Sequence, residues 1–366
     1  MTTTTGTYNL RSARLSRLNG DPRLSAEVMH LVYVSDRQQG ILRKRRGNGF
    51  SYWQQGRKVT ESDVLGRIRS LVIPPAWQQV WICPLDNGHL QVTGLDVKGR
   101  KQYKYHPQWH RLRNMTKFAH LYGFGQVLPA IRQRLEQDLA QPGFPATKVL
   151  ALMVSILEHT SIRIGNAAYE KENGSYGLTT LLNRHVNFEQ HRLRFLFTGK
   201  KAVKQDLVLG NRRLVRIVRQ CRDIPGKELF QYYDDQNNKC SVDSGMVNDY
   251  IRQISGGDFT AKDFRTWTGS LLALRELSLL DTTVGAISMR NKQVVEVLDK
   301  VAAALGNTRS VCRKYYVHPS LPELFVAGKL LSKERWTTLA GDPTLKAEEK
   351  ALMYILKNTS LELEVA

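Results

Sequence analysis

The residues most able to do chemistry are two adjacent tyrosines set among cations. Tyr315 and Tyr316 follow Arg309, Arg313 and Lys314 in one short stretch. A tyrosine hydroxyl can attack an electrophilic centre, and neighbouring cations can stabilise the negative charge of a phosphate under attack. The plainer interpretation is a basic helix with tyrosines along its rim. This segment alone does not separate the two.

Three further cations occupy unusual places. Arg163 follows a strongly apolar helical segment, where it either pairs with an acid such as Glu158, which the local pattern favours, or points into a site. Lys200 lies at the tip of an expected hairpin, where a solvated lysine is the ordinary outcome. Arg265 is expected in the first turn of a helix, where the helix dipole favours anions. A cation there is reasonable if it and the free N–H groups converge on a phosphate.

Motifs for metals and nucleotides do not occur in this sequence. There is no H-E-x-x-H, no paired C-x-x-C, no G-x-x-x-x-G-K-[ST] and no EF-hand loop. Asp234 and Asp235 are adjacent, so on a strand they would point to opposite faces, and a solvated turn is expected instead. We therefore expect no metal site and no cofactor.

The charge of the chain predicts a polyanionic partner. Lys and Arg number 54 against 33 Asp and Glu, a net charge of +21. Residues 1–115 hold 19 basic and 7 acidic residues, so more than half of the surplus lies in less than a third of the chain. Within it stands the run Arg43, Lys44, Arg45, Arg46. Such a run is either a solvated loop or, with the aromatic residues that follow it, part of a nucleic-acid surface.

Composition also bounds the class of protein. Hydrophobic residues make up 42% of the chain, enough for a packed core. No apolar stretch approaches the ~18–20 residues of a membrane span, and the first ten residues lack the pattern of a secretory signal. The four cysteines form no C-x-x-C pair, which is typical of a reducing compartment. We expect a soluble, cytoplasmic protein.

The elements that must position these residues fall into two classes. After an arm at residues 1–30, short β-prone runs separated by Gly, Asn, Asp and Pro indicate a small antiparallel sheet domain at 31–115, with one helix at 62–71. The β-prone runs are 31–34, 50–53, 80–83 and 90–93.

From residue 116 the apolar spacing becomes helical, which predicts a mainly helical domain at 116–325 and a helical tail at 326–366. Two β-prone strings, 192–197 and 202–208, indicate a hairpin with its tip at 198–201. A helix is expected after an N-cap pair of Thr260 and Asp263, and another at 289–305, started by Ser288 and stopped by Gly306. The fold class is therefore α+β.

Taken together, these residues resemble the type IB DNA topoisomerases of the small poxvirus and bacterial kind. The resemblance covers about residues 31–319. Segments in the order and at the intervals of that family are 161–165 (SIRIG), 169–181 (YEKENGSYGLTTL), 197–200 (FTGK), 262–267 (KDFRTW) and 306–316 (GNTRSVCRKYY).

The resemblance implies a tyrosine nucleophile that forms a 3′-phosphotyrosyl bond with DNA and relaxes supercoils without ATP or a required metal. The family tyrosine stands nine residues after the position of Asn307, which implies Tyr316. The family usually has a small residue at the position of Tyr315, so a packing role is expected there.

The resemblance also implies roles for the other polar residues. Arg163 and Arg265 would bind the two non-bridging phosphate oxygens, and Lys200 would protonate the leaving 5′-oxygen. Asn307 would donate one more hydrogen bond. Poxvirus members and tyrosine recombinases usually have histidine at this position, and asparagine fits bacterial members. An asparagine carries no charge and cannot shuttle a proton.

In this family the partner is duplex DNA, preferably supercoiled, which a monomer encloses as a C-shaped clamp. Tyr103 and Tyr105 resemble paired tyrosines that meet DNA, and alternate residues of one strand do point to the same face. Tyr169 resembles a further contact. A tyrosine recombinase is the alternative, although its second arginine normally follows a histidine in H-x-x-R, where this chain has Lys262. A non-catalytic DNA- or RNA-binding protein is a third.

Overall fold

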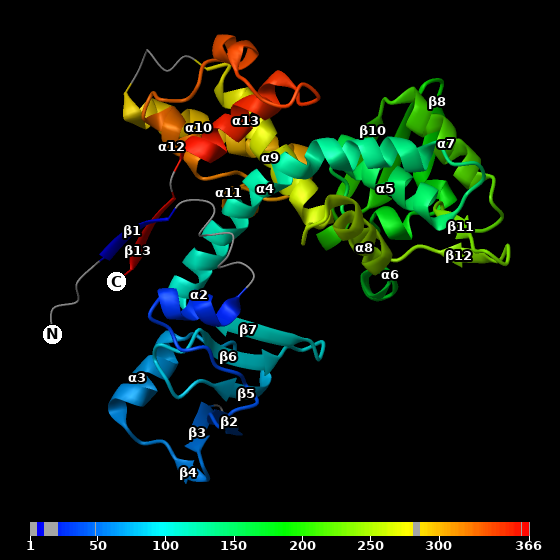
Figure 1. The fold of residues 1–366 in the computed structure, drawn as a ribbon. Coiled ribbons are helices and arrows are strands. Elements are labelled where there is room, and N and C mark those ends of the chain that lie inside the picture. Colours follow the sequence, from blue (N-terminus) through cyan, green and yellow to red (C-terminus); the bar gives the residue numbers. More distant parts are fainter. Residues whose placement is uncertain (1–5, 11–20, 48, 281–285, 360, 366) are drawn as a thin grey trace. The chain divides into compact units, whose positions relative to one another are not determined.

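The structure, a computed structural model, describes all residues except 1–5, 11–20, 48, 281–285, 360 and 366, and leaves out the side chains of 6–10, 114, 115, 117, 119 and 361–365 (Figure 1). Its contacts divide the chain into two compact units, Met1–His120 with Ser360–Ala366, and Leu121–Thr359. Each unit is considered by itself. The domain boundaries expected at residues 30, 115 and 325 stay predictions.

The first unit is built on a six-stranded antiparallel sheet in the order β4-β3-β2-β5-β6-β7. A separate pair joins β1 to β13 in antiparallel register, from Gly6 opposite Val365 to Leu10 opposite Leu361. The strands and helices of this unit are β1 (Gly6–Leu10), α2 (Pro22–Val28), β2 (Ile41–Arg46), β3 (Gly49–Gln54), β4 (Arg57–Lys58), α3 (Ser62–Ser70), β5 (Gln78–Ile82), β6 (Leu90–Leu95), β7 (Lys101–Tyr105) and β13 (Leu361–Val365).

Helix α3 covers one face of the sheet, because Ile68 packs on Ile41, Ile82 and Val92. The helix expected at 62–71 and the strands expected at 50–53, 80–83 and 90–93 are confirmed. The strand expected at 31–34 is wrong.

Residues 31–34 make only an isolated bridge between Val32 and Gly88. Tyr33 stacks on His89 with ring centroids 4.3 Å apart, and the Val34 N–H donates to the same imidazole. Side-chain packing, rather than strand pairing, therefore holds this apolar run.

Helix α4 (Pro107–Leu139) is the longest helix of the structure among the described residues, and it runs from the first unit into the second. The helix begins at Pro107, earlier than the helical spacing from residue 116 indicates. Proline suits a first helical turn, because the N–H that it lacks would have no partner there.

The second unit is mainly helical, with a three-stranded antiparallel sheet β10-β9-β8 and a small pair β11-β12. Its elements are α5 (Ala146–Thr160), α6 (Ala167–Asn173), β8 (Val186–Glu189), β9 (Arg192–Thr198), β10 (Lys204–Leu209), α7 (Arg212–Arg222), β11 (Gln231–Tyr233), β12 (Lys239–Ser241), α8 (Ser244–Ser255), α9 (Ala261–Leu277), α10 (Ile287–Leu305), α11 (Arg309–Tyr315), α12 (Ser320–Val326) and α13 (Ala347–Asn358), with short 3₁₀ turns at Leu178–Thr180, Asn183–His185, Lys200–Ala202 and Lys333–Thr338.

The core of the second unit surrounds α5, whose residues from Val149 to Leu157 are all buried. Helices α7, α8 and α9 and strand β10 pack on it (Figure 1). A helix that is apolar on all sides must be enclosed. The sequence at its C-terminal end, where Arg163 lies, is therefore held by a rigid core.

Most of the expected local structure of the second unit is confirmed. The hairpin joins β9 to β10, Thr260 and Asp263 form the capping box of α9, and Gly306 ends α10 in the left-handed conformation. The predicted start of α10 is wrong, because Ala286 and not Ser288 is its N-cap residue. Asp234 lies in a turn, where its carboxylate accepts from the Gln236 and Asn238 N–H groups.

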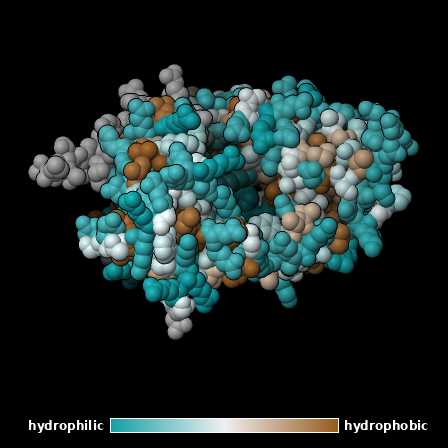
Figure 2. Space-filling model, turned by 90° about the horizontal axis from the view of Figure 1, so that it is seen from below, coloured by the Kyte–Doolittle hydropathy of each residue, from teal (hydrophilic) through white to brown (hydrophobic). Residues whose placement is uncertain are grey.

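The protein is thus a mixed α and β structure with antiparallel sheets, as expected. On the face shown in Figure 2, hydrophilic residues predominate and hydrophobic residues form small separate patches. None of the helices in the described part of the chain is long and apolar enough to cross a membrane.

Candidate active site

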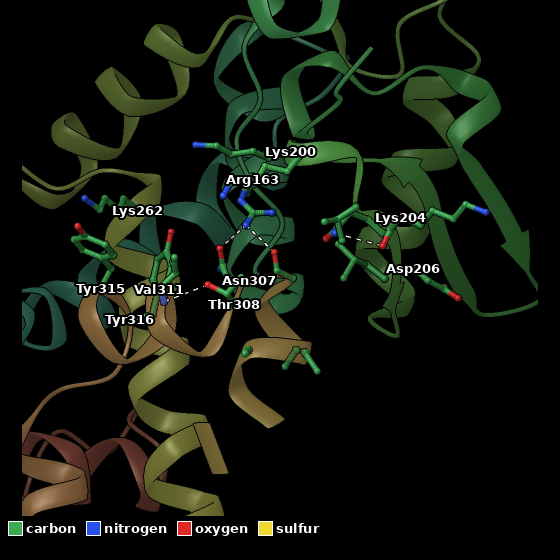
Figure 3. Close-up of a pocket in the computed structure, with 18 residues that line it drawn as sticks. Arg163, Lys200, Lys204, Asp206, Lys262, Asn307, Thr308, Val311, Tyr315 and Tyr316 are labelled. Atoms are coloured by element: carbon green, nitrogen blue, oxygen red, sulfur yellow. Dashed lines mark hydrogen bonds between the residues drawn. The ribbon is translucent and has the colours of Figure 1, made fainter. Parts of the chain in front are cut away.

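An open pocket of about 900 Å³ in the second unit gathers most of the residues singled out above. Arg163, Lys200, Asn307, Tyr315 and Tyr316 all line it (Figure 3). They come from the loop after α5, the β9–β10 hairpin, the α10–α11 turn and the end of α11. Residues more than 150 positions apart in the sequence therefore meet around one space.

The loop that carries Arg163 begins at Ser161, which ends α5 with a left-handed backbone. The main chain beyond is fixed by two hydrogen bonds, from Leu178 N–H to the Arg163 carbonyl (2.8 Å) and from Thr179 N–H to the Ile164 carbonyl (2.7 Å). A Cβ at Gly177 would stand only 2.5 Å from the Gly165 Cα. Such close backbone approach requires glycine and leaves the loop little freedom.

The Arg163 guanidinium is bound to the α10–α11 turn. Its Nη2 donates to the Gly306 carbonyl (2.8 Å) and to Asn307 Oδ1 (2.6 Å), as the dashed lines in Figure 3 show. The expected ion pair with Glu158 is wrong, because Glu158 pairs with Arg132 at 2.7 Å. Arg163 thus points into the pocket, and Asn307 serves as an acceptor that orients it.

Arg265 lies beneath the same turn and is only 5% exposed. It is the fifth residue of α9, so its expected place in the first turn is wrong. Its guanidinium donates to the carbonyls of Ser161 and Leu305 and stands 5.2 Å from the Tyr316 ring centroid. Its buried Nε has no acceptor among the described residues.

The two arginines lie close enough for their positive charges to repel one another. Burial, and then the charge of Arg265, lowers the pKa of Arg163 below its ordinary value. The acceptors named above are main-chain carbonyls and an amide, all neutral, so they leave the positive charge uncompensated. A pair of partly desolvated cations that has no carboxylate partner in the described part of the chain favours binding of an anion.

Tyr316 is held by its main chain. Ser270 on α9 donates to the Tyr316 carbonyl (3.2 Å) and accepts from the His318 N–H (3.1 Å). A Cβ at Gly269 would stand 2.6 Å from the Tyr316 carbonyl oxygen and 3.0 Å from its Cβ. Glycine at 269 therefore lets α9 approach the tyrosine.

The two tyrosines face different surroundings. In Figure 3 the Tyr316 hydroxyl lies on the side of Arg163 and Asn307, whereas Tyr315 lies farther from them, near Lys262. The Lys314 ammonium stands 5.3 Å from the Tyr315 ring centroid. Of the two hydroxyls, that of Tyr316 is the better placed to meet an anion bound by the arginines.

Lys200 is exposed at the hairpin tip. The tip is closed by a hydrogen bond from Gly199 N–H to the Val203 carbonyl (2.8 Å). Lys201 and Ala202 both have positive φ, at 61° and 57°. Left-handed backbone costs roughly 1 kcal/mol or more for each non-glycine residue, so the tip is a locally strained turn.

The tyrosines expected to contact DNA have the orientation that strand geometry predicts. Tyr103 and Tyr105 lie on β7, an edge strand, and their rings stack with centroids 6.0 Å apart. Tyr103 is 48% exposed. Tyr169, on α6 of the second unit, is 47% exposed.

The basic run of the first unit forms strand β2 and not a solvated loop, which was one of its two interpretations. Arg43 differs from the rest of the run: its guanidinium donates to the carbonyls of Pro74 (3.1 Å) and Trp77 (2.6 Å). Burial lowers the pKa of Arg43. Lys44, Arg45 and Arg46 are exposed. Arg43 thus supports the fold, while the other three present charge to solvent.

Sequence reasoning missed three residues of this site: Gly269, Ser270 and Gln205. A small pair on an apolar helix gives no signal until its partner is known, and a glutamine on a hairpin is ordinary. No group of three or more His, Cys, Asp or Glu in the described ranges could hold a metal ion.

Comparison with known families matches residues 104–325 to the catalytic core of eukaryotic DNA topoisomerase I, and residues 49–96 to the N-terminal domain of bacterial DNA topoisomerase IB. DNA topoisomerase 1B of Acanthamoeba polyphaga mimivirus is 30% identical over 322 residues, which cover 84% of this chain and 94% of that protein. DNA topoisomerase I of monkeypox virus is 25% identical over 252 residues, which cover 68% and 76%.

Among solved structures, the XerH site-specific recombinase bound to palindromic difH, a post-cleavage complex, covers 57% of this chain and 49% of that chain. The TM-score is 0.34 and the identity 14%. A likeness this weak does not bear on activity.

Proposed function

Because the chain belongs to the type IB DNA topoisomerase family, we propose that it relaxes supercoiled duplex DNA through a transient single-strand break. The observation that carries this proposal is the pocket of the second unit, where Tyr316 meets Arg163, Lys200 and Asn307 above the buried guanidinium of Arg265. These are a nucleophile, two anion-binding groups, a proton donor and an orienting amide around one space.

In the proposed reaction the Tyr316 hydroxyl loses its proton to water as its oxygen attacks the phosphorus of one phosphodiester, and it recovers a proton from water after religation. A bond forms from that oxygen to phosphorus as the bond to the 5′-oxygen breaks, which leaves a 3′-phosphotyrosyl bond and a 5′-hydroxyl end. The broken strand rotates about the intact one, and the 5′-hydroxyl then attacks the phosphotyrosine to reseal the strand. The covalent bond conserves the energy of the phosphodiester, so religation requires no ATP.

The arginines act on the charge that grows on the two non-bridging oxygens. Donors fixed in advance stabilise such charge most effectively, since they need no reorganisation during the reaction. Arg163 and Arg265 fit this requirement, because carbonyls of rigid elements already hold them. An oxygen that accepted from Arg265 Nε would remove the cost of about 1–3 kcal/mol of a buried donor without a partner.

Asn307 acts in this proposal mainly through Arg163. Its Oδ1 accepts from that guanidinium (2.6 Å) and its amide donates to the Leu305 carbonyl (3.2 Å). An asparagine in this position orients the arginine without adding charge, so the arginines alone would bear the electrostatic work.

Lys200 supplies the proton in this scheme. The 5′-oxygen is a poor leaving group as an alkoxide, and a lysine ammonium that donates to it lowers the barrier. In religation the neutral amine takes the proton back from the attacking 5′-hydroxyl. An exposed hairpin tip is suitable for reaching an oxygen that belongs to the DNA.

Duplex DNA is the proposed substrate and partner. We propose that a monomer binds it, in the compartment that contains the DNA. We propose that Tyr103, Tyr105 and Tyr169, with the exposed cations Lys44, Arg45 and Arg46, contribute phosphate and backbone contacts. Such contacts position a protein on a duplex without reading its sequence.

Relaxation of a supercoiled plasmid tests this function. We expect relaxed topoisomers in buffer that contains EDTA and no ATP, and none with the Tyr316→Phe variant, which keeps the ring but lacks the hydroxyl. DNA binding by this variant should be nearly unchanged. An active Tyr316→Phe enzyme, or an inactive wild type in EDTA, would contradict the proposal.

A further inference from the structure

Gln205, on β10, lines the pocket between the β9–β10 hairpin tip and the α10–α11 turn. A Cβ at Gly199 would stand 2.9 Å from the Gln205 Cγ, and a Cβ at Gly306 would stand 2.9 Å from its Nε2 and its Oε1. Real Cβ atoms rarely come so close to a neighbour, so both glycines leave room for this one side chain. Gly199 directly precedes Lys200, and Gly306 directly precedes Asn307.

The Gly306 side of this contact is fixed independently of Gln205. The Asn307 N–H donates to the Ala302 carbonyl (2.9 Å), and the Gly306 N–H donates to that of Ala303 (3.1 Å). The Gly306 carbonyl also accepts from Arg163. The turn is thus part of the helix end and of the arginine site.

The Gly199 side has less support. Beyond Thr198, whose carbonyl accepts from the Tyr176 N–H (2.8 Å), the tip consists of the short 3₁₀ turn Lys200–Ala202 and is closed by the bond from Gly199 to Val203. Lys201 and Ala202, which follow Lys200, are exposed and have a strained left-handed backbone. Removal of a side chain that fills the space between the tip and the turn should therefore displace the tip rather than the turn.

We propose that Gln205 is a positioning residue for Lys200. Its side chain, seated between Gly199 and Gly306, holds the hairpin tip at a set distance from the turn that orients Arg163. Gln205 acts by this contact and transfers no proton itself. The inference rests on the proposed function, since it concerns the proton that Lys200 gives to the departing 5′-oxygen.

A substrate whose leaving group needs no proton distinguishes a residue that positions the proton donor from a residue that stabilises the phosphate oxygens. In a suitable duplex, sulfur replaces the bridging 5′-oxygen at the cleaved bond. The departing strand then leaves as a thiolate, because a thiol has a pKa of about 8.5, far below that of an alcohol. Loss of Lys200, or of its placement, should slow cleavage of the oxygen substrate only. Loss of Arg163 should slow cleavage of both, since the non-bridging oxygens are the same.

The experiment measures single-turnover cleavage of the two substrates by wild type and by Gln205→Ala, Lys200→Ala and Arg163→Ala. A misplacement of about 1 Å can cost 10²-fold in rate, so we expect Gln205→Ala to slow cleavage of the oxygen substrate by about 10–100-fold. On the sulfur substrate it should cleave at a rate close to that of wild type, as Lys200→Ala does. Gln205→Met, which keeps the length of the side chain, should be close to wild type on both.

A matched control is Gln220→Ala, since Gln220 is an exposed glutamine of α7 in the same unit and does not line the pocket. It should change neither rate. If Gln205→Ala is equally slow on both substrates, or not slow on either, the inference is wrong while the proposed function stands. If wild type cleaves neither substrate, the proposed function itself fails. Thermal unfolding of each variant shows whether a rate loss reflects loss of the fold.

Discussion

The pocket has two halves that are built in opposite ways. Arg163 and Arg265 are held by carbonyls of the residue that ends α5, of α10 and of the turn after α10, and Arg265 is 5% exposed. Lys200 stands exposed on a strained tip. One half is thus fixed before any substrate arrives, whereas the other is held by few contacts.

The difference follows from what each half must do. Stabilising charge on phosphate oxygens is most effective when the donors are already oriented, because reorganisation would cost part of the gain. A proton donor must instead come within hydrogen-bond reach of an atom of the substrate. Rigid helix ends suit the first task, and an exposed hairpin tip suits the second.

The largest expected effect tests the two halves against each other. Lys200→Ala should slow cleavage of ordinary DNA by about 10²–10⁴-fold, the usual contribution of a general acid, and Arg163→Ala by about 10²–10³-fold. Single-turnover cleavage of the oxygen- and sulfur-bridged duplexes measures both. Only the lysine variant should recover on the sulfur substrate. Recovery of the arginine variant as well would remove the distinction between the halves.

A smaller effect is expected where α9 meets the nucleophile. Gly269→Ala would place a methyl group 2.6 Å from the Tyr316 carbonyl, so the tyrosine must shift, and we expect cleavage to slow by about 10–100-fold. Thr268→Ala, at a half-buried position of the same helix, is the matched control and should retain its rate. The binding constant for DNA should change little in either variant. An unchanged rate for Gly269→Ala would show that the fixed half tolerates displacement.

The free energy of unfolding should also depend on pH, through His318, which lies two residues after Tyr316. Burial lowers the pKa of His318 to about 3, whereas in an unfolded chain it is about 6.5. Between these values the unfolded chain binds a proton that the folded chain does not, so the free energy of unfolding falls as pH drops below 6.5. The loss from this group should be about 2 kcal/mol at pH 5.

Urea unfolding of wild type and His318→Asn across pH 5–8 measures this contribution. Asparagine retains an acceptor for the Ser320 N–H, which donates to His318 Nδ1 at 3.3 Å, but it does not titrate. The variant should therefore lose less stability than wild type between pH 7 and pH 5. Equal losses would show that His318 is not the responsible group.

The same contrast recurs, with the smallest effects, in strand β2. Arg43 is bound to carbonyls and Arg45 is exposed on the same strand. Arg43→Ala should lower the free energy of unfolding by about 1–2 kcal/mol. Arg45→Ala should leave stability unchanged and reduce the slope of log affinity against log salt by about one. Unfolding and salt-dependent DNA binding measure the two, and a reversed pattern would contradict the assignment.

The sequence predicts what depends on local pattern. The β9–β10 hairpin, the capping box of Thr260 and Asp263, and the end of α10 at Gly306 all follow from signals within a few residues. The resemblance to the topoisomerase family correctly identified the family. The roles of Tyr316, Arg163, Lys200, Arg265 and Asn307 stay predictions, although all but Arg265 line one pocket, and Arg265 lies beside it.

What the sequence did not predict depends on distant partners. Glu158 does not pair with Arg163, because Arg132 is shared between Glu158 and Glu349 of α13. Likewise β1 pairs with β13 across nearly the whole chain. A short-range pattern cannot choose between a near partner and a distant one, since that choice is made by packing.

The identity of the nucleophile is the central claim, and trapping the covalent adduct tests it most directly. When the short fragment that carries the new 5′-hydroxyl end dissociates from the duplex after cleavage, religation is prevented and the protein–DNA adduct accumulates. Digestion and mass spectrometry then locate the modified residue. We predict the nucleotide on Tyr316, and a nucleotide on Tyr315, or no adduct at all, would contradict the account.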